Sequence, residues 1–217
     1  MDSSTSSGHA SSSTGRPSLL DRGLLLAFVY PAFFVPYGLV NRSIAVESGR
    51  NLTTELDRLT PFVPEFMYLF YLAYALPALG LFIGARHRLL AAAGAVAALI
   101  AGSCIIFAVF PVTVPRPEAL PDTLAGRLVA TTYAADRPVC GFPSLHVSMS
   151  FLTALIVVRE RRLVGVVAMV FCALTSVAVL FVKQHVVADV LGGLAIAGAC
   201  YWLYRRLDIW LFTRTRP

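Results

Sequence analysis

The sequence predicts an all-α protein, a polytopic membrane bundle of about six transmembrane helices. Hydrophobic residues fill 57% of the 217 positions and charged residues only 14%, whereas an average soluble domain has about 45–50% and about 25%. The mean hydropathy is +0.73, and the apolar residues fall into runs near the ~20 residues that a membrane-crossing helix needs. This balance excludes a soluble globular enzyme.

The chain is expected to begin with a disordered tail at 1–18, where Ser, Thr and Gly dominate and little apolar surface is available for burial. The first apolar run, 24–40, has no small-residue cleavage site at its end, so we expect it to remain as the first span. The other spans are expected at 62–84, 90–111, 144–158, 163–182 and 186–204. The membrane domain therefore covers 19–207, and a cytoplasmic tail follows at 208–217.

The basic residues indicate a topology rather than a nucleic-acid partner. The formal net charge is +6, but the arginines are scattered over short loops instead of forming one stripe, so no nucleic acid is expected. Eleven of the 18 basic residues fall in the two tails and in the second and fourth loops. By the positive-inside rule, both termini are cytoplasmic and the first, third and fifth loops face outward.

The polar residues that a structural role explains least well fall in the third loop and the fifth turn, on the predicted outer side. They are Arg116, Ser144, His146, Lys183, His185 and Asp189. An ionisable residue at the edge of a span is costly and indicates function. We therefore treat this set as a candidate site.

His185 and Asp189 are four residues apart, a spacing that puts both on one face of a helix. The carboxylate can accept a hydrogen bond from one imidazole nitrogen, which fixes the tautomer and leaves the other nitrogen free to attack an electrophile. The alternative is a buried pair that ties the last helix to a neighbour.

Ser144 is expected to cap the fourth span, and His146 follows it in the first turn. The free N–H groups and the positive dipole end of such a helix favour a bound anion, which suits a phosphate. Alternatively, the serine is only a cap and the histidine only lies at the membrane interface.

Arg116 offers a planar fork that matches two phosphoryl oxygens. Lys183 is the single lysine among the 18 basic residues, and its ammonium would lie beside the expected nucleophile. Snorkelling of this lysine to the membrane interface explains it nearly as well.

Other side chains are expected to have structural roles. Tyr68, Tyr71 and Tyr74 fit packing in the second span and an interfacial aromatic belt. Gly192, Gly193 and Gly198 fit close contact between helices. The four cysteines form neither a disulfide framework nor a zinc spacing.

Three short motifs occur in order along the outer loops. They read Arg116-Pro117, then Phe142-Pro143-Ser144-Leu145-His146, then His185 with Asp189 and Gly192-Gly193. Together they resemble the type 2 phosphatidic acid phosphatase superfamily, in particular its inositol phosphorylceramide synthase-like branch, from about residue 24 to 205. The resemblance implies a six-helix membrane bundle whose motifs meet at the outer face.

The resemblance also implies roles for the motif residues. His185 would be the nucleophile that forms a phosphohistidine, and Asp189 would orient it. His146 would be the general acid that protonates the leaving oxygen. Arg116 and Ser144 would hold the phosphoryl oxygens. No metal and no other cofactor is required in that scheme.

The chain departs from the commonest family pattern at two positions. Val109 and Val179 stand where the first and third motifs usually carry a lysine and an arginine. Lys183 would then supply phosphate-binding charge from a different place. A second Arg-Pro pair occurs at Arg137, but Arg116 is preferred because it follows the third span closely.

These observations predict a metal-independent phosphatase of the cell membrane that hydrolyses a lipid phosphate or diphosphate on the extracytoplasmic face. One alternative is a phosphotransferase that passes a phosphoryl or inositol-phosphoryl group to a lipid acceptor. Another is a non-catalytic transporter or scaffold. The expected partners are the lipid phosphate substrate and membrane lipids, whereas the identity of the lipid and the oligomeric state are left open.

Overall fold

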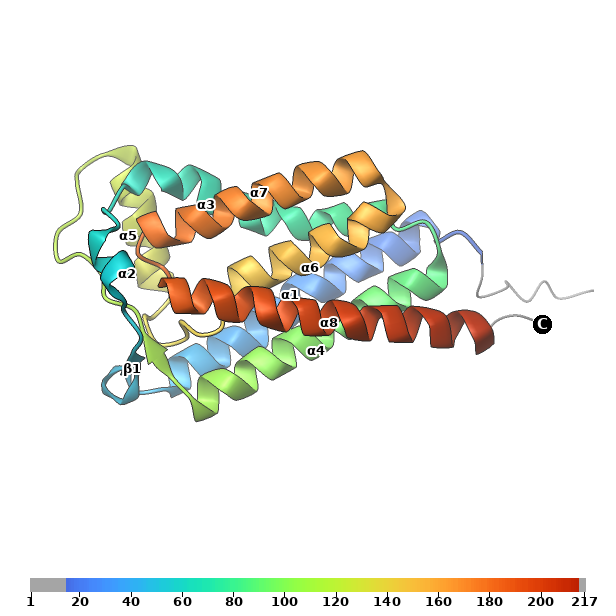
Figure 1. The fold of residues 1–217 in the computed structure, drawn as a ribbon, viewed down its shortest axis with the longest axis horizontal. Helices are drawn as coiled ribbons and strands as arrows, with labels where there is room; N and C mark the ends of the chain where they lie inside the picture. Colours follow the sequence, from blue (N-terminus) through green and yellow to red (C-terminus); the bar gives the residue numbers. More distant parts are fainter. Residues whose placement is uncertain (1–14, 215–217) are drawn as a thin grey trace, which may run out of the picture.

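The computed structural model describes residues 15–214. Within that range six helical segments run side by side along one axis (Figure 1). They are α1 (Leu19–Ser43), a continuous segment of η2, α3 and η3 (Pro64–Phe66, Met67–Ala75 and Leu76–Phe82), α4 (Arg86–Val109), α6 (Leu145–Glu160), α7 (Arg162–Phe181) and α8 (Val187–Arg214). The predicted all-α membrane bundle is confirmed. Most of the expected disordered tail at 1–18 lies outside the described residues and stays a prediction.

Among these segments, all except α6 are long and apolar enough to cross a membrane. The α6 helix has only 16 residues and begins with polar side chains. It lies in the centre of the bundle, where it packs against α7, α8 and η3. The six expected spans therefore appear as five span-length segments around one short, central helix.

The helix boundaries differ from the expected ones at three places. The second span changes from α-helix to 3-10 helix at Leu76, because Pro77 lacks the N–H that would continue the α-helical pattern. The third loop contains an additional helix, α5 (Leu124–Ala135), which Thr123 caps. The expected tail at 208–217 is helical as far as Arg214, since no glycine or proline interrupts the last part of α8.

The loops at one end of the bundle fold over it and are held together by short elements (left in Figure 1). These are η1 (Val46–Ser48), β1 (Arg50–Asn51), α2 (Glu55–Leu59), β2 (Val112–Thr113) and α5. β1 pairs in parallel with β2, which joins the first loop to the third. The Asp57 carboxylate accepts the Val187 N–H at 2.7 Å and so ties α2 to the start of α8.

Two glycines allow α8 to approach the start of α6. A Cβ atom on Gly193 would lie 2.7 Å from the Ser144 carbonyl oxygen, and one on Gly192 would lie 2.3 Å from the Phe142 ring. The expected close contact is therefore confirmed for Gly192 and Gly193. It is wrong for Gly198, where an added Cβ atom would meet no neighbouring element within 4 Å. The contact at Gly192 and Gly193 brings the first turns of α6 and α8 together, which is where the candidate residues lie.

Candidate active site

His185 and Asp189 are in contact, although not on one face of a helix as expected. The α8 helix begins only at Val187, so His185 lies in the turn before it. His185 Nδ1 is 3.3 Å from Asp189 Oδ2, and the same oxygen accepts the Val186 N–H at 3.0 Å. Both side chains are buried. The carboxylate therefore reaches back from the first turn of α8 and orients the imidazole.

His146 lies directly against His185. Its Nδ1 is 3.2 Å from His185 Nε2, and its Nε2 is 2.9 Å from the Tyr74 hydroxyl. The His146 ring packs on Phe70, with ring centroids 4.7 Å apart. The two histidines are within direct hydrogen-bonding distance, which leaves no room for a phosphorus atom between them. Phosphate binding at His185 Nε2 would require the two rings to separate.

Ser144 is the N-cap of α6, as predicted. Its hydroxyl oxygen accepts the Val147 N–H at 3.3 Å. Its own N–H donates to the Asp189 carbonyl oxygen at 3.0 Å, which locks the start of α6 to α8. The side chain is fully buried. Its hydroxyl proton is still available as a donor to an anion.

Arg116 is held by three acceptors. Nη1 donates to the carbonyl oxygens of Tyr133 and Asp136 at 3.3 and 2.8 Å, and Nη2 donates to Gln184 Oε1 at 3.0 Å. Its guanidinium also lies 4.0 Å from the centroid of the Tyr133 ring. Within the described part of the chain, Arg116 Nε and Gln184 Nε2 are buried donors without an acceptor. Such donors suit an anion, because a buried N–H group without a partner is costly.

Lys183 has a contact that neither sequence interpretation anticipated. Its Nζ donates to the carbonyl oxygens of Asp57 and Thr60 at 2.9 and 2.6 Å, so the lysine joins the turn before α8 to the end of α2. Its φ of 51° lies in the left-handed region, which is uncommon for residues other than glycine. Burial lowers the pKa of Lys183, and the nearby Asp57 opposes that shift. One ammonium proton is left for a further acceptor.

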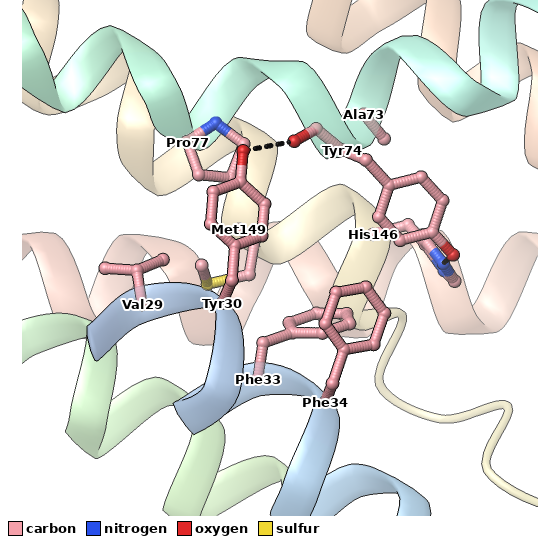
Figure 2. Close-up of a pocket in the computed structure, with 9 residues that line it drawn as sticks. All are labelled: Val29, Tyr30, Phe33, Phe34, Ala73, Tyr74, Pro77, His146 and Met149. Carbon is pink, nitrogen blue, oxygen red and sulfur yellow. Dashed lines mark hydrogen bonds between the residues drawn. The ribbon is translucent and has the colours of Figure 1, made fainter. Parts of the chain in front are cut away.

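The histidine pair separates two cavities. His185 lines a cavity of about 430 Å³, here called the basic cavity, together with Arg116 and Lys183. His146 lines one of about 620 Å³, here called the aromatic cavity, between α1, α3 and α5. Besides His146, five aromatic side chains line the aromatic cavity: Phe33, Phe34, Tyr37, Tyr71 and Tyr74. A smaller apolar pocket continues from His146 along α1 and α3 (Figure 2).

The sequence analysis missed Asp136, which follows α5 and faces the aromatic cavity. Its Oδ1 accepts hydrogen bonds from the Tyr37 hydroxyl and, at 3.2 Å, from Asn41 Nδ2. Burial raises the pKa of Asp136, whereas the Tyr37 hydrogen bond, Arg116 and His185 oppose that shift. No motif marks this residue, because its position depends on how α5 packs.

Gln184 and Tyr74 were also missed. Gln184 stands between Lys183 and His185, so its place beside two candidates was a signal available in the sequence. Tyr74 was assigned to packing, but its hydroxyl contacts His146. The second Arg-Pro arginine, by contrast, lies elsewhere: Arg137 Nη1 donates to the carbonyl oxygens of the last residues of α1.

No three His, Cys, Asp or Glu side chains within residues 15–214 are grouped so that they would hold a metal ion. The metal independence of the chemistry stays a prediction.

The bundle of apolar, span-length helices and the family profile together define an integral membrane protein of phosphatase type. The chain belongs to the PAP2 superfamily, that of the type 2 phosphatidic acid phosphatases, whose family profile matches residues 44–203. No curated protein and no solved structure matches the chain. The predicted superfamily is thereby confirmed, whereas the inositol phosphorylceramide synthase-like branch stays a prediction.

Proposed function

We propose that this protein hydrolyses a lipid phosphate or diphosphate through a phosphohistidine intermediate, without a metal ion. The observation that carries the proposal is the His146–His185 pair, which lies between a cavity that Arg116 and Lys183 line and a cavity with several aromatic rings in its walls. The basic cavity suits the phosphoryl group, and the aromatic cavity suits an apolar alcohol. A lipid phosphate carries both parts, joined by the bond that is to be cleaved.

In the first step, His185 Nε2 attacks phosphorus, so that an N–P bond forms and the bond to the lipid oxygen breaks. Asp189 accepts the His185 Nδ1–H and stabilises the positive charge that develops on the ring. His146, as an imidazolium, gives its Nδ1 proton to the leaving oxygen, a contribution of typically 10²–10⁴-fold in rate. The lipid alcohol is then free to leave.

In the second step, a water molecule attacks the phosphohistidine. His146 Nδ1, now without its proton, removes a proton from that water, and the N–P bond breaks to release phosphate. Arg116, Lys183 and Ser144 would hold the phosphoryl oxygens in both steps through the donors that their protein contacts leave available. Both histidines return to their starting states.

A panel of lipid phosphates tests the proposal. We expect purified protein in detergent to release phosphate from at least one of phosphatidate, a polyprenyl diphosphate and a sphingoid base phosphate, with unchanged rate in the presence of EDTA. Complete inhibition by EDTA, restored by added Mg²⁺, would contradict the metal-independent scheme. Absence of release from all three lipids, by protein that is folded by circular dichroism, would contradict the phosphatase activity itself.

Phosphoryl transfer to an alcohol is the second candidate. The aromatic cavity beside His146 can accept an alcohol in place of the departing one, and the covalent step is shared. Adding lipid alcohols or inositol phospholipids to the same assay distinguishes the two functions. A new phosphodiester or phosphomonoester product in excess of free phosphate would favour transfer.

We also propose that the site faces the extracytoplasmic side, as the arginine distribution indicates. In a variant without the native cysteines, Ala119→Cys probes the site end of the bundle and Arg162→Cys the opposite end; both positions are exposed. An impermeant thiol reagent added to intact cells is expected to label position 119 and to leave 162 unlabelled. The reverse pattern would move the chemistry to the cytoplasm.

A further inference from the structure

We propose that Tyr74 is a positioning residue, which holds His146 with its Nδ1 directed at the reacting phosphoryl group during both steps. This inference rests on the proposed function. Its basis is a continuous chain of hydrogen bonds that runs from Tyr74 through His146 and His185 to Asp189. In Figure 2 the Tyr74 ring, from α3, points toward the His146 imidazole.

The chemistry of each group fixes the direction of the hydrogen bonds. An ionised Asp189 only accepts, so His185 carries its proton on Nδ1 and keeps a lone pair on Nε2. The His146 nitrogen that faces this lone pair, Nδ1, must therefore donate. The remaining His146 nitrogen, Nε2, is the one that Tyr74 contacts at 2.9 Å.

A tyrosine hydroxyl serves His146 in every protonation state of the reaction. It donates to Nε2 when that nitrogen carries a lone pair, and it accepts from Nε2–H when His146 is an imidazolium. It also accepts from Nε2–H after Nδ1 has given its proton away, and this leaves Nδ1 bare to receive a proton from water. The hydrogen bond therefore persists while the Nδ1 proton comes and goes.

Tyr74 is itself held in place. Its carbonyl oxygen accepts a hydrogen bond from the Tyr30 hydroxyl at 2.7 Å (Figure 2). Its ring stacks on Phe34, with centroids 5.9 Å apart and planes inclined by 17°. The ring nearest to the His146 imidazole is that of Phe70, which offers no polar atom. The His146 imidazole contacts two polar side chains, those of His185 and Tyr74, and Tyr74 is the one that takes no part in bond formation under the proposed mechanism.

The test is the Tyr74→Phe variant, which removes the hydroxyl and keeps the ring. We expect kcat for a lipid phosphate to fall by about 10- to 100-fold, as for a misplaced catalytic group, with KM changed less than threefold. Hydrolysis of p-nitrophenyl phosphate should fall much less, because its leaving group needs no proton. Tyr68→Phe, a half-exposed tyrosine of the same helix, is the matched control and should retain the wild-type rate.

A double-mutant cycle separates positioning from a general effect on structure. If Tyr74 acts through His146, Tyr74→Phe causes no further loss when His146 is already alanine. Equal losses in the presence and absence of His146, or a Tyr74→Phe rate equal to that of the wild type, would overturn the inference. The His185→Ala variant tests the proposed function separately. If His185→Ala stays active, the proposed function is contradicted. If His185→Ala is inactive but Tyr74→Phe has the wild-type rate, only the role of Tyr74 is contradicted.

Discussion

Replacing His185 with alanine is expected to abolish turnover on every substrate, with a loss of kcat greater than about 10³-fold. The variant removes the atom that forms the N–P bond, so no leaving group, however good, restores the rate. Phosphate release from the best lipid of the panel, and from p-nitrophenyl phosphate, measures the effect. Residual activity above one tenth of the wild-type rate on either substrate would show that another group is the nucleophile.

The control for this variant is His87→Ala. His87 is also a buried histidine paired with a carboxylate, at 3.3 Å from Asp208, but it lies at the other end of the bundle. The His87→Ala variant should retain the wild-type activity. Comparing the melting temperatures of both variants in detergent separates loss of chemistry from loss of fold, since only a folded, inactive His185→Ala supports the assignment.

The His146→Ala variant is expected to discriminate between leaving groups. A lipid alkoxide needs a proton in the transition state, whereas p-nitrophenolate departs without help. We therefore expect a loss of roughly 10²–10⁴-fold in kcat on the lipid phosphate and a loss at least tenfold smaller on p-nitrophenyl phosphate. The measurement is the ratio of kcat/KM values for the two substrates, relative to wild type.

Equal losses on the two substrates would mean that His146 acts in phosphate binding or in the shared second step, and does not protonate the leaving oxygen. His185→Ala provides the internal reference, because it should lose both activities alike. The two variants together assign nucleophile and acid to different rings, although the rings lie in direct contact.

The sequence was sufficient for the parts of the fold that depend on long apolar runs. Each of the six runs forms a helical segment, because an apolar segment in a lipid environment must satisfy its backbone hydrogen bonds internally, and a helix does so. The central position of α6 was not predictable, since a short apolar run with polar residues at its start has the same pattern as a short transmembrane helix. The same applies to α5, whose cap and packing lie within a loop.

The candidate site likewise contains residues that the sequence predicts and residues that it does not. The motif residues were identified because their types and order carry chemical information. Tyr74 contacts His146 across 72 positions of sequence, and Asp136 contacts Tyr37 across 99. Such pairs follow from the packing of helices, and the sequence pattern holds no trace of them. The His185–Asp189 contact was expected, yet it arises from a carboxylate reaching back over a turn.

The position of α1 outside the family profile has a consequence for how substrate preference can evolve. The superfamily profile begins at residue 44, after α1 has ended, yet α1 provides Phe33, Phe34 and Tyr37 to the aromatic cavity. The proposed catalytic residues therefore lie in the part of the chain that the profile matches, while one wall of the aromatic cavity lies outside that part. If that cavity selects the lipid, substitutions in α1 can diversify substrate preference without touching the catalytic groups, and a chimera that exchanges α1 alone would inherit the donor's selectivity.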